Sequence, residues 1–191
     1  TWIVGLAGGD LGNYMLGEGF DYRGGPRRVF MTEVIGPVAG SIRRHADLLG
    51  MYVEETAPLT TFLGSLEERR KLRFDDIVVL GEPRKGLLER LMERLAPRGH
   101  LALICPEIIR GKAKLDIGRI HYDYLHVIGA ASWVAMEAYR NRRSSILTET
   151  GAAWFIGAGG PMGQMHLQRI LQREKTPRLI MCTDVDEARL D

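Results

Sequence analysis

The sequence predicts an α/β protein with a doubly wound parallel sheet, in which helices cover both faces of the strands. Two observations lead to this prediction. The apolar residues gather in short, continuously apolar runs, as is typical of parallel strands that are buried on both faces. Segments with helical periodicity lie between several of these runs, which favours right-handed parallel crossovers. The strands of the main sheet are expected near residues 2–6, 28–33, 51–54, 76–81, 100–105 and 125–130.

Three segments between these runs are expected to form helices. The segment 38–49 has one apolar face, formed by Val38, Ile42, Ala46 and Leu49. The segment 86–95 gathers its leucines on one side, and we expect this helix to stop before the proline and glycine of the segment 97–99. Ser132 is a candidate N-cap of a third helix, which would run through Tyr139.

Composition and charge exclude several classes of protein. The 191 residues include 26 basic and 24 acidic side chains, for a formal net charge of +2, and 45% of them are apolar. This is enough apolar material for one sizeable core or two small ones. Because the basic residues are interspersed with acids, nucleic acid is not an expected partner. No apolar run approaches the roughly 20 residues that cross a bilayer, so no membrane segment is expected.

The ends and the cysteines suggest where the protein resides. Cys105 and Cys182 both lie in apolar runs, where buried, reduced thiols are expected. The chain opens at Thr1 on a strand-like run and not on a signal peptide. We therefore expect a cytoplasmic protein without disulfides. The start in mid-strand, without an initiator methionine, suggests a piece of a longer protein, although processing also removes terminal residues.

A pattern near the start of the sequence returns near its end. The opening reads Trp-Ile-Val-Gly-Leu-Ala-Gly-Gly-Asp-Leu-Gly over residues 2–12, and residues 154–163 read Trp-Phe-Ile-Gly-Ala-Gly-Gly-Pro-Met-Gly. The next strand-like run ends in Thr-Glu-Val in the first copy and in Thr-Asp-Val in the second. The carboxylate follows the last glycine by 21 residues in both copies. Agreement in motif, strand and spacing predicts a tandem duplication.

The repeat also predicts the domain organisation. Residues 1–131 are expected to form a complete first unit, and residues 132–150 a linker helix. Residues 151–191 are expected to begin a second unit that stops after its second strand, as a truncated copy would.

A strand, a glycine-rich turn, a helix and a second strand that ends in a carboxylate form the arrangement of a Rossmann-like dinucleotide-binding fold. Glycine permits the tight turn and the close approach of a pyrophosphate, and the helix start supplies free N–H groups. The carboxylate accepts hydrogen bonds from a ribose. In the second copy, the candidate cofactor-binding residues are Gly157, Gly159, Gly160, Gly163 and Asp184. The side chains expected to pack the following helix on the sheet are Met162, Met165, Leu167, Ile170 and Leu171.

The first copy has a weaker pattern. Its candidate cofactor-binding residues are Gly8, Gly9, Gly12 and Glu33. Several further glycines follow in the segment 13–25, and each would cost a helix roughly 1 kcal/mol relative to alanine. We therefore expect a short helix and a loop there. Both turns have an alternative interpretation, in which the glycines serve only the packing of a doubly wound sheet.

The run Trp154–Arg169 and the segment Thr183–Leu190 look like the cofactor domain of medium-chain zinc-type alcohol and polyol dehydrogenases, particularly sorbitol and L-sorbose 1-phosphate dehydrogenases. The segments 74–81, 91–104 and 118–129 resemble later parts of that domain. The resemblance implies that the glycines of the second turn line the pyrophosphate and that the following aspartate holds the ribose. An acid there favours NAD over NADP, whose additional phosphate it would repel.

The sequence also departs from that family. The catalytic zinc of the family sits in a separate GroES-like domain that this chain does not contain. Its histidines and cysteines do not have the paired spacing of a zinc site: they are His45, His100, His121, His126, His166, Cys105 and Cys182. No metal site is therefore expected, and no residue receives a catalytic role.

The expected function is that of the NAD(P)-binding portion of an oxidoreductase. Such an enzyme moves hydride between a nicotinamide and an alcohol, polyol or sugar-phosphate carbonyl, and its protein part orients the cofactor. One alternative is a structural or oligomerisation module with a degenerate nucleotide-binding fold. Another is an enzyme that binds S-adenosylmethionine or a sugar nucleotide. The expected partner is a small-molecule substrate, and the formation of homo-oligomers is left open.

Overall fold

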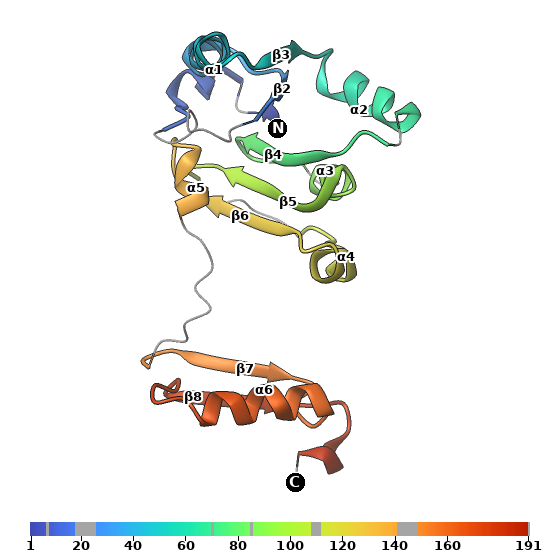
Figure 1. The fold of residues 1–191 in the computed structure, drawn as a ribbon, viewed down its shortest axis with the longest axis vertical. Coiled ribbons are helices and arrows are strands. Elements are labelled where there is room, and N and C mark those ends of the chain that lie inside the picture. The colour runs from blue at the N-terminus through green and yellow to red at the C-terminus, as the bar shows by residue number, and fades with distance from the viewer. Residues whose placement is uncertain are drawn as a thin grey trace. The chain divides into compact units, whose positions relative to one another are not determined.

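The computed structural model describes residues 1–6, 8–17, 26–69, 71–84, 86–107, 112–140 and 149–190. The chain divides into two compact units, Thr1–Arg142 and Arg143–Asp191 (Figure 1). Over the described residues, the helices are too short or too polar to span a membrane.

The first unit is built on one parallel sheet of six strands. The strands, in chain order, are β1 (Trp2–Gly5), β2 (Arg28–Thr32), β3 (Tyr52–Glu55), β4 (Phe74–Leu80), β5 (Leu95–Ile104) and β6 (His126–Ala130). Their order across the sheet is β3-β2-β1-β4-β5-β6, and every pairing is parallel. This is the strand order of the doubly wound dinucleotide-binding fold. The α/β, Rossmann-like fold class that the sequence predicts is confirmed.

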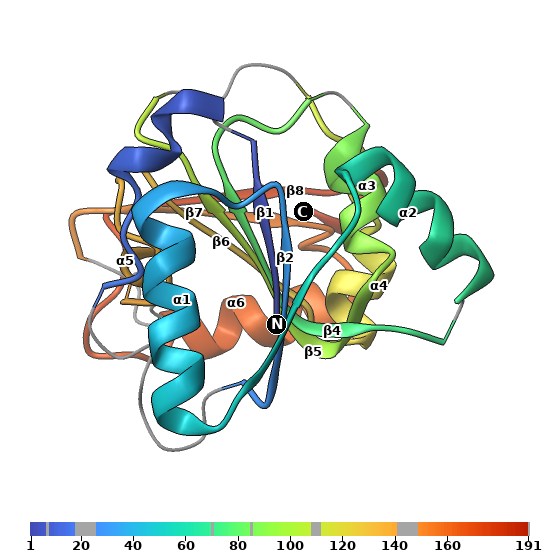
Figure 2. The same cartoon turned by 90° about the horizontal axis from the view of Figure 1, so that it is seen from above.

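Helices lie on both faces of this sheet, and each face has its own apolar core. The helices of the first unit are η1 (Gly8–Asn13), α1 (Gly36–Leu49), α2 (Leu59–Glu68), α3 (Leu87–Met92), α4 (Ile117–Tyr122) and α5 (Met136–Arg140). One core packs η1, α1 and α5 on the sheet, and the other packs α2, α3 and α4. Figure 2 shows α1 and α2 on opposite sides. Along β1 the side chains alternate, so that Ile3 enters the first core and Trp2 and Val4 enter the second.

The helix α1 follows the expected periodicity. Val38, Ile42 and Ala46 are buried, whereas Leu49 at the last position is exposed. Gly50 ends the helix with a φ of 65°, and its N–H donates to the carbonyl of Ala46. A glycine adopts this left-handed conformation without steric cost, which explains why the helix stops here.

The expected helix over 86–95 is shorter than its leucines suggest. The helix α3 ends at Met92, and the proline and glycine of the segment 97–99 lie inside β5 and not beyond a helix end. The guanidinium of Arg119 in α4 donates to the carbonyls of Met92 and Leu95, at 2.8 and 3.1 Å. These bonds and the pairing of β5 with β4 prevail over the local helical periodicity.

The second unit is a single β-α-β element. It consists of β7 (Ala152–Ile156), α6 (Pro161–Leu171), β8 (Leu179–Thr183) and the short η2 (Glu187–Arg189). The two strands pair in parallel. Of the side chains expected to pack α6 on the sheet, Leu167 and Ile170 are half-buried, but Met162, Met165 and Leu171 are exposed. The helix covers one face of only two strands, which leaves the outer side of the helix in solvent.

The described part of the expected linker helix, residues 132–140, belongs to the first unit. The backbone N–H of Ala135 donates to the carbonyl of Met15, and the side chain of Ala138 is buried in the core. Ser132 accepts a hydrogen bond from the N–H of Val134, but the helix starts only at Met136. Residues 141–148 lie outside the described residues.

Candidate functional site

The glycine-rich turn of the second unit joins β7 to α6. Gly157, directly after β7, has a φ of 76°, in the left-handed region that favours glycine. The N–H groups of Gly157 and Ala158 both donate to the carbonyl of Thr183 at the end of β8, at 2.7 and 3.0 Å. The turn is therefore attached to the carboxyl end of the neighbouring strand, which is where doubly wound sheets bind their ligands.

Gly163 allows α6 to start directly against this turn. A Cβ atom at this position would overlap the carbonyl oxygen of Gly157 and would lie 2.7 Å from the Cα atom of Ala158. Both neighbours are backbone atoms, which do not move aside as a flexible side chain would. Gly163 therefore permits the close packing of α6 against the turn.

The first turn of α6 has free backbone donors. Pro161 occupies the first helical position and has no N–H, and the first helical hydrogen bond runs from the N–H of Gln164 to the carbonyl of Gly160. The N–H groups of Met162 and Gly163 therefore have no acceptor within the helix. Together with the positive end of the helix dipole, these groups can bind an anion.

Asp184 follows β8 and meets the glycine turn. Its Oδ2 accepts a hydrogen bond from the N–H of Gly159 at 3.0 Å, and its Oδ1 accepts one from the N–H of Asp186 at 3.1 Å. The bond from Asp186 is the main reason why the pKa of Asp184 lies below its ordinary value, and the Gly159 bond and the charge of Arg189 also lower it. The carboxylate is therefore ionised at neutral pH and acts only as an acceptor.

The short helix η2 packs against one side of the same turn. A Cβ atom on Gly159 would overlap the Cβ atom of Arg189 and lie 2.6 Å from its carbonyl oxygen. The side chain of Arg189 turns to Asp186, with 3.1 Å between Nε and Oδ2. Gly159 thus lacks a side chain because the backbone of η2 approaches it. Gly157 and Gly160 have more room, since an added Cβ atom would meet no backbone atom closer than 3.5 Å.

The corresponding residues of the first unit are arranged differently. Gly8, Gly9 and Gly12 lie in the short helix η1 and not at the start of a crossover α-helix. The short helix expected in the segment 13–25 is not found among residues 14–17, and residues 18–25 lie outside the described residues. Gly12 approaches the start of α1, because a Cβ atom on Gly36 would lie 3.8 Å from its Cα atom.

The carboxylate of Glu33 is used elsewhere in the first unit. Its Oε1 accepts a hydrogen bond from the N–H of Leu59 at 3.0 Å, at the start of α2. Glu33 therefore caps a helix, whereas Asp184 meets its glycine turn. The sequence alone could not predict that Glu33 and Asp184 have different hydrogen-bond donors, because the donor to Glu33 belongs to α2.

Sequence reasoning missed a polar row across three strands of the first unit. Asp76, His100 and His126 stand opposite one another on β4, β5 and β6. His100 contacts Asp76 at 3.3 Å, and its ring stacks on that of His126. Tyr139 donates to Asp76, and burial, followed by the charge of Asp76 and this hydrogen bond, raises the pKa of its phenol. The sequence alone does not show that these residues are neighbours, because this depends on the register of the three strands.

Within the described ranges, no three side chains of histidine, cysteine, aspartate or glutamate gather as a metal site would require.

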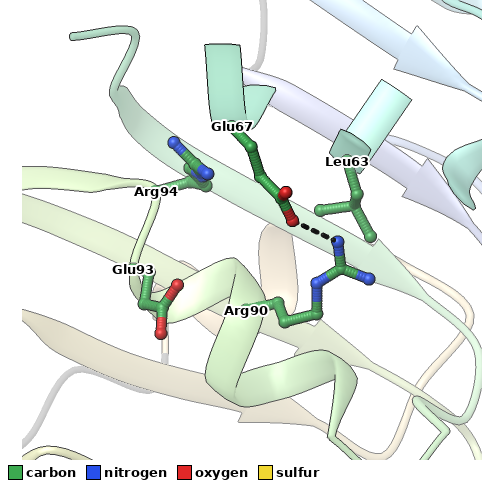
Figure 3. A pocket seen from close by; sticks show the side chains of 5 residues that line it. All are labelled: Leu63, Glu67, Arg90, Glu93 and Arg94. Atoms are coloured by element: carbon green, nitrogen blue, oxygen red, sulfur yellow. Dashed lines mark hydrogen bonds and ion pairs between the residues drawn. The ribbon is translucent and has the colours of Figure 1, made fainter. Parts of the chain in front are cut away.

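Sequence reasoning also missed a groove of about 310 Å³ between α2 and α3 (Figure 3). Its lining residues are Leu63, Glu67, Arg90, Glu93 and Arg94. Arg90 and Glu67 form an ion pair across it at 3.4 Å. The groove lies beside the start of β5, at the amino ends of the strands. It is therefore at the end of the sheet opposite to the one where such folds bind dinucleotides.

Comparisons with known proteins find only solved structures of low sequence identity. No protein-family model matches it, and no curated protein does. A crystal structure of AibC is 15% identical, with 95% of this chain and 49% of that chain covered and a TM-score of 0.36. A "putative alcohol dehydrogenase" from Sinorhizobium meliloti 1021 is 14% identical, with 95% and 48% covered and a TM-score of 0.36. The chain spans about half the length of these two structures.

Proposed function

We propose that the second unit binds the dinucleotide of an NAD-dependent oxidoreductase. The enzyme would transfer hydride between the nicotinamide and an alcohol, polyol or sugar-phosphate carbonyl. One observation carries the proposal: the Asp184 carboxylate meets the glycine turn at the point where α6 begins. This juxtaposition combines an anion site with a ribose acceptor, as dinucleotide binding requires.

The residues of the turn have separate tasks in this proposal. The N–H groups of Met162 and Gly163 bind the pyrophosphate at the positive end of α6. Gly157 and Gly160 leave room for it, whereas Gly159 is covered by Arg189. The ionised Asp184 accepts hydrogen bonds from the ribose hydroxyls, and its charge repels an additional phosphate, so that NAD is preferred over NADP. The nicotinamide, when bound, supplies the hydride chemistry.

Calorimetry of the whole chain with NAD tests the proposal. We expect NAD to bind more tightly than NADP or S-adenosylmethionine, and Asp184→Ala to abolish the preference for NAD over NADP. The control is Glu33→Ala, which removes the matching acid of the first unit and its bond to Leu59. NAD binding that survives Asp184→Ala and is lost in Glu33→Ala would assign the cofactor to the first unit.

A structural module without a ligand is the second candidate function. It is favoured by the exposure of the second unit, in which Ala158 and Pro177 are the only buried residues among those described. A unit with so little core of its own is typical of a packing element. The absence of calorimetric binding for NAD, NADP and S-adenosylmethionine by the folded chain would favour this function over the first.

A further inference from the structure

Three charged residues lie together after the carboxyl end of β8, beside the glycine turn. The Oδ2 of Asp184 accepts a hydrogen bond from the N–H of Gly159 at 3.0 Å. Arg189 meets the same glycine, because a Cβ atom on Gly159 would overlap the Cβ atom of Arg189. Asp186 is the third member, and its backbone N–H donates to the Oδ1 of Asp184 at 3.1 Å. One cation and two acids therefore lie beside the place where the proposed function puts the adenosine ribose.

The guanidinium of Arg189 is held by Asp186. The Nε of Arg189 lies 3.1 Å from the Oδ2 of Asp186. The backbone N–H of Arg189 also donates to the carbonyl of Asp186 at 3.1 Å, and this 3₁₀ turn of η2 places the two side chains one above the other. The pKa of Asp184 is lowered first by the hydrogen bond from Asp186 and further by the charge of Arg189. The guanidinium therefore also lies within electrostatic reach of the Asp184 carboxylate.

These charges bear on which dinucleotide the unit accepts. NADP carries an additional phosphate on the ribose, and a guanidinium binds a phosphate through paired, charge-assisted hydrogen bonds. An arginine near the ribose can therefore accommodate NADP. In this unit the guanidinium is already paired with Asp186. A phosphate that took the guanidinium would leave the Asp186 carboxylate unpaired beside the negative charges of the phosphate.

We propose that Asp186 is a specificity-determining residue, which excludes NADP because it keeps the guanidinium of Arg189 from the additional phosphate. This inference rests on the proposed cofactor site and adds a second determinant to it. Asp184 accepts the ribose hydroxyls directly, whereas Asp186 acts through Arg189. The two roles are separable, because Asp186 reaches Asp184 with its backbone N–H and Arg189 with its side chain.

Calorimetry of the whole Asp186→Ala chain with NAD and NADP tests this role. Alanine retains the backbone N–H that donates to Asp184, so the affinity for NAD should stay within about 2-fold of the original. The affinity for NADP should rise about 10-fold, because the released guanidinium gains a charge-assisted bond to the phosphate. The matched control is Glu187→Ala, which removes the next acid of η2 and leaves the pair of Asp186 and Arg189 in place. This control should change the affinity for NADP by less than about 2-fold.

A double variant shows whether Arg189 is responsible. Replacement of both Asp186 and Arg189 by alanine should remove the gain in NADP affinity, whereas a gain caused only by the lost acid would persist. Circular dichroism shows that each variant folds.

The outcomes separate this inference from the proposed function. An unchanged NADP affinity in Asp186→Ala would overturn the role of Asp186, as would an equal gain in Glu187→Ala or a gain that persists in the double variant. In each of these cases, NAD binding by the original chain would leave the proposed cofactor site intact. If neither NAD nor NADP binds to the folded original chain or to Asp186→Ala, the cofactor site itself is refuted, and the role of Asp186 with it.

Discussion

Replacement of Gly163 by alanine tests how the glycine turn works. The added methyl group would overlap the carbonyl oxygen of Gly157 and crowd the Cα atom of Ala158, both of which belong to the backbone of the turn. Such overpacking costs about 1–3 kcal/mol. Relief of the overlap requires α6 and the turn to separate, which displaces the N–H groups that we assign to the pyrophosphate. At about 1.4 kcal/mol for each factor of ten, we expect NAD affinity to fall about 10-fold to 100-fold.

The matched control is Gly12→Ala in the first unit. A Cβ atom at Gly12 would meet nothing within 4 Å. This variant should therefore bind NAD as the original chain does, and its stability should change by less than about 1 kcal/mol. Calorimetry measures both affinities, and circular dichroism shows that both variants fold. Equal NAD affinity in Gly163→Ala and the original chain would refute the assignment of the turn, and a loss confined to Gly12→Ala would move the site to the first unit.

Three further predictions concern stability and pH. Thr32→Val should lower the free energy of unfolding by about 1–3 kcal/mol, because the buried indole of Trp2 loses its acceptor. Thr183→Val, the corresponding change in the exposed second unit, should lower it by less than about 1 kcal/mol. Urea unfolding measures both losses, and equal losses would contradict the argument from burial. Leu66→Ala should destabilise the first unit by about 2–5 kcal/mol, because Leu66 is fully buried, and thermal unfolding that is unchanged would contradict the packing of α2. The pKa of Asp184 lies below its ordinary value, so the contribution of its carboxylate to NAD binding and stability should be complete above the ordinary value and lost as pH falls through the lowered pKa. Calorimetry at pH 5 and 7 should give similar affinities, and a large loss by pH 5 would be inconsistent with this lowered pKa.

Apolar patterning predicted the architecture because burial on both faces leaves a direct mark on the sequence. The runs near residues 2–6, 28–33 and 125–130 became β1, β2 and β6 within one residue at each end. The periodicity of the segment 38–49 likewise predicted α1. Both signals are local, since they depend on the spacing of side chains along a single element.

The start of β5 was predicted less well for a physical reason. The leucines that precede it favour a helix, but Phe74 pairs with Leu95, and Arg119 binds the carbonyls at the end of α3 and at the start of β5. These partners lie more than 20 residues away in the sequence, so a local pattern does not report them.

Local patterns in the sequence are enough to predict that strands and helices alternate, that two glycine-rich turns follow apolar strands, and that an acid ends the next strand in both copies. The hydrogen bonds that each acid makes depend on how the elements pack in three dimensions. Asp184 bonds to Gly159 within its own turn, whereas Glu33 bonds to Leu59 because α2 packs over the first sheet. Equal spacing along the chain places both carboxylates at strand ends. Which N–H group donates to each carboxylate depends on the segment that packs beside that strand end, and this segment differs between the two units.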